Sequence, residues 1–364
     1  MKKGIFISLA ASVFALAVFS TFQKTQWERN LELLHVHFSH ARHVLHLTSP
    51  IFEIDTIYKS MAGPNDTYFF NILEANEPEL LWITGFSVEI IGENAGEDFL
   101  CHNNLDYSAD EYFKKWNLPD RTGMHISRLA TLTQGLSSIE FPGGFGIPLM
   151  SDEDLSTAAQ VMNHNLPNVS LKVKHAIRLE YVPEKELKKQ LKPLFQQSIA
   201  IMPLVDKDSE ETSEIKNTCS PALASIKHLQ IEDGNIYTGH WIVKPGREIR
   251  KQNITNMLNL PFSTTVHYIA VHAHPFVESL ELRDITADTI VFKSFAENFE
   301  KKTGLKKLGY FSSEEGIMLY RNHEYELICT SSNTSGKEQD MMAVMLLYLY
   351  DKQLEGRVRS ILRQ

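Results

Sequence analysis

The stretch Thr264-Thr-Val-His-Tyr-Ile-Ala-Val-His272-Ala-His274 has the pattern of a buried β-strand that ends in two histidines. β-Branched and aromatic residues dominate it, and Pro275 follows where a proline ends strand pairing. Side chains two residues apart on a strand share a face, so both imidazoles can reach one ion. Neutral imidazole binds zinc, copper, iron and nickel, so the pair predicts a metal site without choosing the metal. The alternative is two ordinary histidines, exposed or satisfied in the core.

Similar short runs continue along most of the chain and are separated by Gly, Pro and Asn. Three further examples are Leu81 to Ile91, Val169 to Tyr181 and His240 to Lys244. This spacing predicts a mainly β protein with two antiparallel β-sandwich, jelly-roll-like domains. The chain has 364 residues, of which 43% are hydrophobic, so it can supply two separate cores.

A few segments break this β pattern. Residues 26–48 carry apolar side chains three and four positions apart, which predicts an N-terminal helix that ends before Pro50. Charged residues at helical intervals predict two further helices, over Glu184–Gln197 and Phe295–Thr303.

The stretch Asp206–Thr218 is rich in charged and small polar residues, so we expect a solvated loop or linker there. A domain boundary is therefore placed near residue 190, just before this stretch. The N-terminal sandwich is expected over residues 49–190 and the C-terminal, copper-binding sandwich over residues 191–364.

The chain starts with Met1-Lys2-Lys3 and an apolar run from Gly4 to Ser20. A short positive region before a hydrophobic run is typical of an export signal. We interpret residues 1–20 as a signal peptide, which predicts a periplasmic or secreted protein. The alternative is a membrane anchor over residues 4–20 that is not cleaved.

Composition excludes several classes of protein. The formal net charge of -9 opposes binding to nucleic acid or to an anionic membrane surface, because both would repel the chain. The cysteines number three, Cys101, Cys219 and Cys329, so one disulfide at most can form and the fold must rest on its core.

A second strand with unusual chemistry lies near the C-terminus. It reads Asp340-Met341-Met342-Ala343-Val344-Met345-Leu346-Leu347-Tyr348-Leu349-Tyr350. Methionine is usually a filler of cores. A thioether beside two imidazoles, however, is a soft ligand set that favours Cu(I).

Several motifs occur in an order that resembles the catalytic domain of the copper- and ascorbate-dependent monooxygenases, the peptidylglycine α-hydroxylating and dopamine β-monooxygenases. They are Trp241-Ile-Val-Lys-Pro245-Gly246-Arg-Glu248, then His272-Ala-His274, then Cys329 and Asp340-x-Met342-x-Val344. The resemblance implies that His272, His274 and Met342 hold an oxygen-activating copper. Met341 remains the alternative sulfur ligand, because a slip of one residue would turn it to the ligand face.

The N-terminal half resembles the family's second, electron-transferring copper site less closely. In Phe99-Leu-Cys101-His102-Asn103-Asn104-Leu105, a cysteine stands where the first of two histidines is expected. In Gln160-Val-Met162-Asn-His164, Met162 falls on the third ligand position and His164 follows on the same face. The resemblance makes His102 and His164 candidate ligands of a second copper. With Cys101 and Met162 they could form a soft Cu(I) site, or this domain is a scaffold that has lost its ion.

The substrate pocket of the family is also altered. Ala270 stands where the peptide hydroxylases of the family have an arginine that grips a carboxylate, and Val344 and Leu346 replace their pocket Asn and Tyr. An apolar wall cannot orient a carboxylate. We therefore expect a less polar small molecule in place of a peptide.

The other histidines of the β-rich part have no close partner in the sequence. They are His125, His175, His228, His240, His267 and His323. Each is more often a surface or core residue than a ligand. His240, next to Trp241, is the one to test first.

The resemblance thus implies an oxidoreductase, a copper-dependent monooxygenase that hydroxylates a C–H bond of a non-peptide small molecule with O2. Ascorbate or another reductant would supply the electrons. One copper ion is expected, and a second remains open. A non-catalytic periplasmic copper-binding or copper-delivery protein is the alternative, and a metal-free sandwich module for partner binding is the third interpretation.

Overall fold

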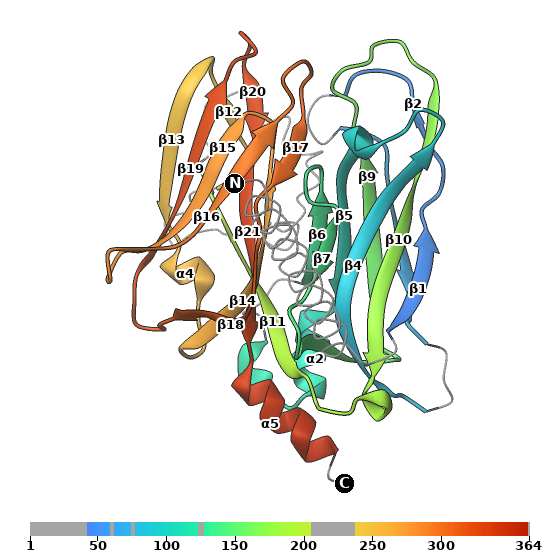
Figure 1. Ribbon diagram of the computed structural model, residues 1–364, viewed down its shortest axis with the longest axis vertical. Helices are drawn as coiled ribbons and strands as arrows, with labels where there is room; N and C mark the ends of the chain where they lie inside the picture. Colours follow the sequence, from blue (N-terminus) through green and yellow to red (C-terminus); the bar gives the residue numbers. More distant parts are fainter. Residues whose placement is uncertain (1–41, 59–61, 74–76, 123–126, 205–236, 363–364) are drawn as a thin grey trace, which may run out of the picture. The chain divides into compact units, whose positions relative to one another are not determined.

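The computed structural model describes residues 42–58, 62–73, 77–122, 127–204 and 237–362. Strands dominate these ranges, so the prediction of a mainly β, antiparallel sandwich fold is confirmed (Figure 1). The signal segment, residues 26–41 of the N-terminal helix and the loop Asp206–Thr218 lie outside the described residues. Among the residues that are described, none of the helices combines the length and the apolar character that a membrane span requires.

Two sheets form the N-terminal part. The first contains β1 (His43–Thr48), β10 (Leu171–Pro183), β4 (Leu80–Gly92) and β8 (Phe145–Met150), with β2 (Phe52–Ile54) beside β10 and β7 (Ser138–Glu140) beside β4. The second contains β3 (Asn65–Phe70), β9 (Leu155–Val161), β5 (Leu100–Tyr107) and β6 (Arg128–Thr133). The short helices of this part are η1 (Glu97–Phe99), α2 (Ala109–Lys115), η2 (Pro119–Arg121) and η3 (Glu184–Glu186).

The C-terminal part repeats the two-sheet plan. One set of strands is β11 (Lys192–Ala200), β21 (Ala343–Tyr350), β14 (Thr264–Ala273) and β18 (Phe311–Leu319). The opposing sheet is β13 (Gly246–Asn253), β19 (Tyr325–Asn333), β15 (Val277–Asp284), β16 (Thr289–Asn298) and β17 (Leu305–Leu308). A two-stranded ribbon joins β12 (Trp241–Val243) to β20 (Gln339–Met341), and α4 (Thr255–Leu258) and α5 (Lys352–Ile361) complete the part.

The first sheet continues from one part into the other. β8 and β11 pair in parallel over two residue pairs, Phe145 with Lys192 and Gly146 with Pro193. The strand order is therefore β1-β10-β4-β8-β11-β21-β14-β18. The boundary near residue 190 stays a prediction, and β11 begins just after it.

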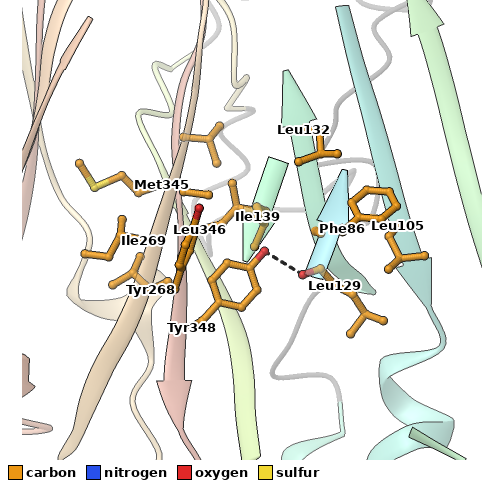
Figure 2. Packing of buried hydrophobic residues seen from close by; sticks show 14 of the residues in the cluster. Phe86, Leu105, Leu129, Leu132, Ile139, Tyr268, Ile269, Met345, Leu346 and Tyr348 are labelled. Carbon is orange, nitrogen blue, oxygen red and sulfur yellow. Dashed lines mark hydrogen bonds between the residues drawn. The ribbon is translucent and has the colours of Figure 1, made fainter. Parts of the chain in front are cut away.

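One hydrophobic cluster includes buried residues of both parts, so the expectation of two separate cores is wrong. Figure 2 shows the contact, with Leu129 of β6 on one side and Tyr268 and Tyr348 of β14 and β21 on the other. The Tyr348 hydroxyl donates to the Leu129 carbonyl at 2.9 Å. The ring of Phe141 lies 4.8 Å from the ring of Tyr348 and 5.9 Å from that of Tyr268. All six residues of β6 are buried, because the C-terminal strands cover it.

The three helix predictions are wrong wherever the structure describes them. Residues 43–48 of the predicted N-terminal helix form β1, which pairs with β10 so that Leu45 faces Leu179. Within Glu184–Gln197 only η3 is helical, and β11 starts at Lys192. In Phe295–Thr303 the first residues belong to β16, which pairs with β15. In each case the segment with helical spacing is short, so pairing with a neighbouring strand decides its conformation.

The strand predictions fared better. The four predicted runs correspond to β4, β10, β12 and β14, and the long three agree with their strands to within two residues at each end. These runs are long and β-rich, so the local signal and the sheet agree.

Candidate metal centre

His272 and His274 lie at the end of β14 and are both buried, with exposed fractions of 2% and 8%. Their ring centres are 5.8 Å apart, and the rings are nearly perpendicular, at 80°. The two imidazoles therefore lie side by side, as the alternation of a strand requires.

The His272 ring is buried without hydrogen bonds. Neither its Nδ1 nor its Nε2 has a hydrogen-bond partner among the described residues. Burying a polar group without a partner costs on the order of 1 to 3 kcal/mol, so an unpaired ring at a fully enclosed position needs an explanation. A metal ion provides one, since a ring nitrogen is a metal ligand.

Burial also fixes the charge of this ring. It holds the pKa of His272 well below 6.5, and the nearby rings of His274, His102 and His240 lower that pKa further. His272 is therefore neutral at physiological pH. The neutral imidazole is the form that binds metals.

Asp340 bridges His274 and a third histidine, His240. The Asp340 Oδ2 lies 2.9 Å from Nδ1 of His240 and 3.0 Å from Nδ1 of His274. The ring centres of the two histidines are 5.3 Å apart. One ligand atom from each of the three residues lies within 4.8 Å of the other two, which is close enough for one metal ion.

The carboxylate of Asp340 is ionised in this setting. Burial alone would raise the pKa of Asp340, but the hydrogen bonds and the charges of His240 and His274 outweigh it and hold that pKa well below its usual range. The negative charge keeps Nδ1 of each ring as the donor. Nε2 of His240 is buried without a hydrogen-bond partner among the described residues, so it is a nitrogen that can bind an ion.

The strand register places Met342 beside these histidines. Antiparallel pairing joins Ala273 to Ala343, and the His274 N–H donates to the Met342 carbonyl at 3.2 Å, which extends the pairing by one residue. On the other side Trp241 pairs with Met341, so His240 is next in register with Met342. Residues opposite each other in an antiparallel pair share a face, and this register favours Met342 over Met341 as the sulfur ligand.

The neighbouring positions on this face are apolar. His272 pairs with Val344, and Ala270 pairs with Leu346 one step further along the strands. The three apolar side chains are almost completely buried. Among the described residues, these three positions thus form an apolar wall beside the histidines and carry no charge that could pair with a carboxylate.

The residues predicted for a second copper site lie in the electrostatic surroundings of His274. His102 on β5 is completely buried, and burial, Arg128, His175 and then His274 hold its pKa well below 6.5. Burial lowers the pKa of His164 to about 4, and His274 contributes.

The soft side chains of this predicted second site lie together. Cys101 and Met162 form a small buried cluster of their own. A second ion at His102 and His164 stays a prediction.

His240 is the residue that the sequence did not assign to the centre, and Asp340 was quoted only as the start of a motif. No His-x-His or similar spacing marks either one. They meet because β12 pairs with β20, a contact between segments about a hundred residues apart. That pairing could not be read from local pattern.

The sequence matches no protein-family model and no curated protein. Solved structures that show some similarity include viral proteins. The major capsid protein P2 from bacteriophage PM2 is 8% identical, covering 84% of this chain and 99% of that chain with a TM-score of 0.31. The infectious bursal disease virus VP2 subviral particle is 10% identical, covering 87% and 74% with a TM-score of 0.21. At such low scores these similarities carry no argument about fold or function.

Proposed function

We propose that this protein is a copper-dependent monooxygenase whose ion is held by His272, His274 and Met342. The observation that carries the proposal is the His272 ring, buried and neutral, with both nitrogens lacking a hydrogen-bond partner in the described part of the chain. The expected substrate is a weakly polar small molecule, and O2 and ascorbate or another reductant are the expected co-reactants.

The donor set fits copper by its chemistry. Two neutral imidazoles and a thioether make a soft set that suits Cu(I), and a hard oxygen-preferring cation such as Mg²⁺ would bind it poorly. When bound, copper supplies the one-electron and O2 chemistry that no side chain here can perform.

The surrounding residues have supporting roles. Asp340 holds the His274 ring through Nδ1 and so aims Nε2 away from the carboxylate. Ala270, Val344 and Leu346 exclude water from the centre and provide an apolar wall for a C–H substrate. A copper at His102 and His164 would serve as an electron relay, and export through residues 1–20 would place the protein in the periplasm or outside the cell.

The first experiment measures copper content of the purified full chain by mass spectrometry of the metal. We expect about one tightly bound copper, and its loss in the double variant His272→Ala, His274→Ala. The matched control is His323→Ala, because His323 also pairs with a carboxylate, Asp284, at 2.7 Å. Full copper content in the double variant would refute the proposed centre.

The second experiment tests turnover. Copper-loaded protein and ascorbate are incubated with a panel of apolar and aromatic substrates, and oxygen uptake and hydroxylated products are followed. The proposal requires substrate-dependent uptake that the double variant lacks.

A second function, copper binding or delivery without turnover, is favoured by the burial of the centre. Neither His272 nor His274 is more than 8% exposed, and Met342 is completely buried. An ion enclosed in this way is well suited to storage or transfer. Copper binding with no substrate-dependent oxygen uptake would favour this function over the monooxygenase.

A further inference from the structure

His240, His274 and Asp340 form a compact group that three separate segments bring together. His240 precedes β12, Asp340 lies on β20, and His274 follows β14. One ligand atom of each residue lies within 4.8 Å of the other two. In the part of the chain that the structure describes, His272 does not belong to this group. The group is therefore a candidate ion site separate from the set of His272, His274 and Met342.

The distances at Asp340 suit ion binding as well as hydrogen bonding. Its Oδ2 lies 2.9 Å from Nδ1 of His240 and 3.0 Å from Nδ1 of His274. Two ligand atoms that bind one zinc ion at about 2.0 to 2.1 Å are roughly 2.9 Å apart at a right angle and roughly 3.4 Å apart at the tetrahedral angle. Small side-chain movements would therefore admit an ion between the carboxylate and the two rings.

The ring protons are compatible with ligation through Nδ1. A neutral imidazole binds an ion through the nitrogen that carries no proton, so an ion at Nδ1 requires the proton to lie on Nε2. Nε2 of His240 is buried and has no hydrogen-bond partner within the described ranges. Moving the proton of this ring to Nε2 therefore breaks no hydrogen bond at that nitrogen.

The ligand types distinguish this group from the predicted copper set. Two imidazoles and one carboxylate are a known zinc set, in which three protein ligands leave the fourth position to water. Thioether and imidazole suit Cu(I), whereas a carboxylate oxygen suits a harder ion. The Asp340 side chain is 24% exposed and that of His240 is 11% exposed, so water can reach the fourth position.

We propose that His240, His274 and Asp340 bind a second ion, Zn²⁺, with water in its fourth position. The ion would fasten the ribbon of β12 and β20 to the end of β14. This site goes beyond the proposed function and does not depend on it, because it uses neither His272 nor Met342. The proposed copper would use Nε2 of His274, at the other end of the ring. With both ions bound, His274 would bridge them after release of its second ring proton.

The test titrates the full chain, freed of copper, with Zn²⁺ in competition with a chromophoric chelator. We expect one zinc ion per chain. The zinc affinity should fall at least about 100-fold in His240→Ala, because removing a ligand costs more than the 10- to 100-fold typical of a residue that only supports one. It should fall at least about tenfold in Asp340→Asn, which keeps the shape of the side chain and removes its charge.

Two controls and one spectrum sharpen this test. His272→Ala should bind zinc as the wild type does, because His272 lies outside the set. His323→Ala should do so too, although it breaks a comparable pair with Asp284 at 2.7 Å. X-ray absorption of the zinc-loaded wild type should fit two imidazoles and two oxygens without sulfur, and this readout does not depend on the folding of any variant.

Three results would overturn the inference. The first is a zinc affinity in the wild type no higher than in His240→Ala. The second is sulfur in the zinc spectrum, and the third is an equal loss of zinc affinity in His272→Ala and His240→Ala. Failure of the proposed function looks different, because His272→Ala would then keep its Cu(I) while His240→Ala still loses zinc.

Discussion

Replacement of Asp351 by Asn should destabilise the protein by about 3 kcal/mol or more. Asp351 is completely buried and forms an ion pair with Arg121 of η2, whose side chain is 3% exposed. The Arg121 guanidinium also lies 4.4 Å from the ring centres of Phe113 and Phe195. The ion pair thus joins η2 of the N-terminal part to the start of α5.

The magnitude follows from separating the two roles of Asp351. Its carboxylate accepts hydrogen bonds from the Gln353 and Leu354 backbone N–H groups at 3.1 and 2.9 Å, so it caps α5. Asn caps a helix about as well as Asp, so Asp351→Asn keeps the cap and removes the charge. Removing one partner of a buried ion pair costs about 3 to 5 kcal/mol, whereas a lost cap costs about 1 kcal/mol.

The assay is urea unfolding followed by tryptophan fluorescence and circular dichroism. A double variant, Arg121→Met with Asp351→Asn, should be more stable than Asp351→Asn alone, because no charge is left buried and the methionine packs against Phe113 and Phe195. Asp351→Ala should cost about 1 kcal/mol more than Asp351→Asn. A loss of less than about 1 kcal/mol in Asp351→Asn, or a double variant that is less stable, would refute this reasoning.

Further predictions concern other parts of the fold. Burial lowers the pKa of the His175 imidazole to about 4, whereas the same imidazole in the unfolded chain is protonated below about pH 6.5. The free energy of unfolding should therefore fall by about 3 kcal/mol as the pH is lowered towards 4, and by less in His175→Gln. Tyr348→Phe leaves the Leu129 carbonyl without its donor and should cost about 1 to 2 kcal/mol in urea unfolding. Burial raises the pKa of Cys329 to about 12, so iodoacetamide at pH 8 should label it only after unfolding, as peptide mapping by mass spectrometry will show. Free copper at one hundred times its dissociation constant should raise the free energy of unfolding of the wild type by about 2.7 kcal/mol. It should leave the free energy of unfolding of the His272→Ala, His274→Ala variant unchanged.

Sequence reasoning was most successful where one strand carried the whole signal. The run from Thr264 to His274 predicts a buried strand, which is β14, and the alternation of side chains along it predicts that His272 and His274 lie on the same face. The backbone hydrogen bond from His274 to Met342 places these two residues opposite each other, and Met342 as a ligand stays a prediction.

Sequence reasoning failed where the conformation of a segment or the contacts of a residue depended on partners far away in the sequence. Residues 43–48 have apolar spacing that suits a helix, and pairing with β10 makes them a strand. His240 shows the same limit at the candidate centre, because only the ribbon of β12 and β20 brings it to Asp340. A lone histidine carries no spacing from which such a partner could be inferred.

The shared sheet has a practical consequence for protein engineering. A fragment cut at the predicted boundary would expose the buried face of β6, and its counterpart would expose Tyr268 and Tyr348. Such surfaces invite aggregation, so the halves should be insoluble when expressed separately and recoverable only when produced together.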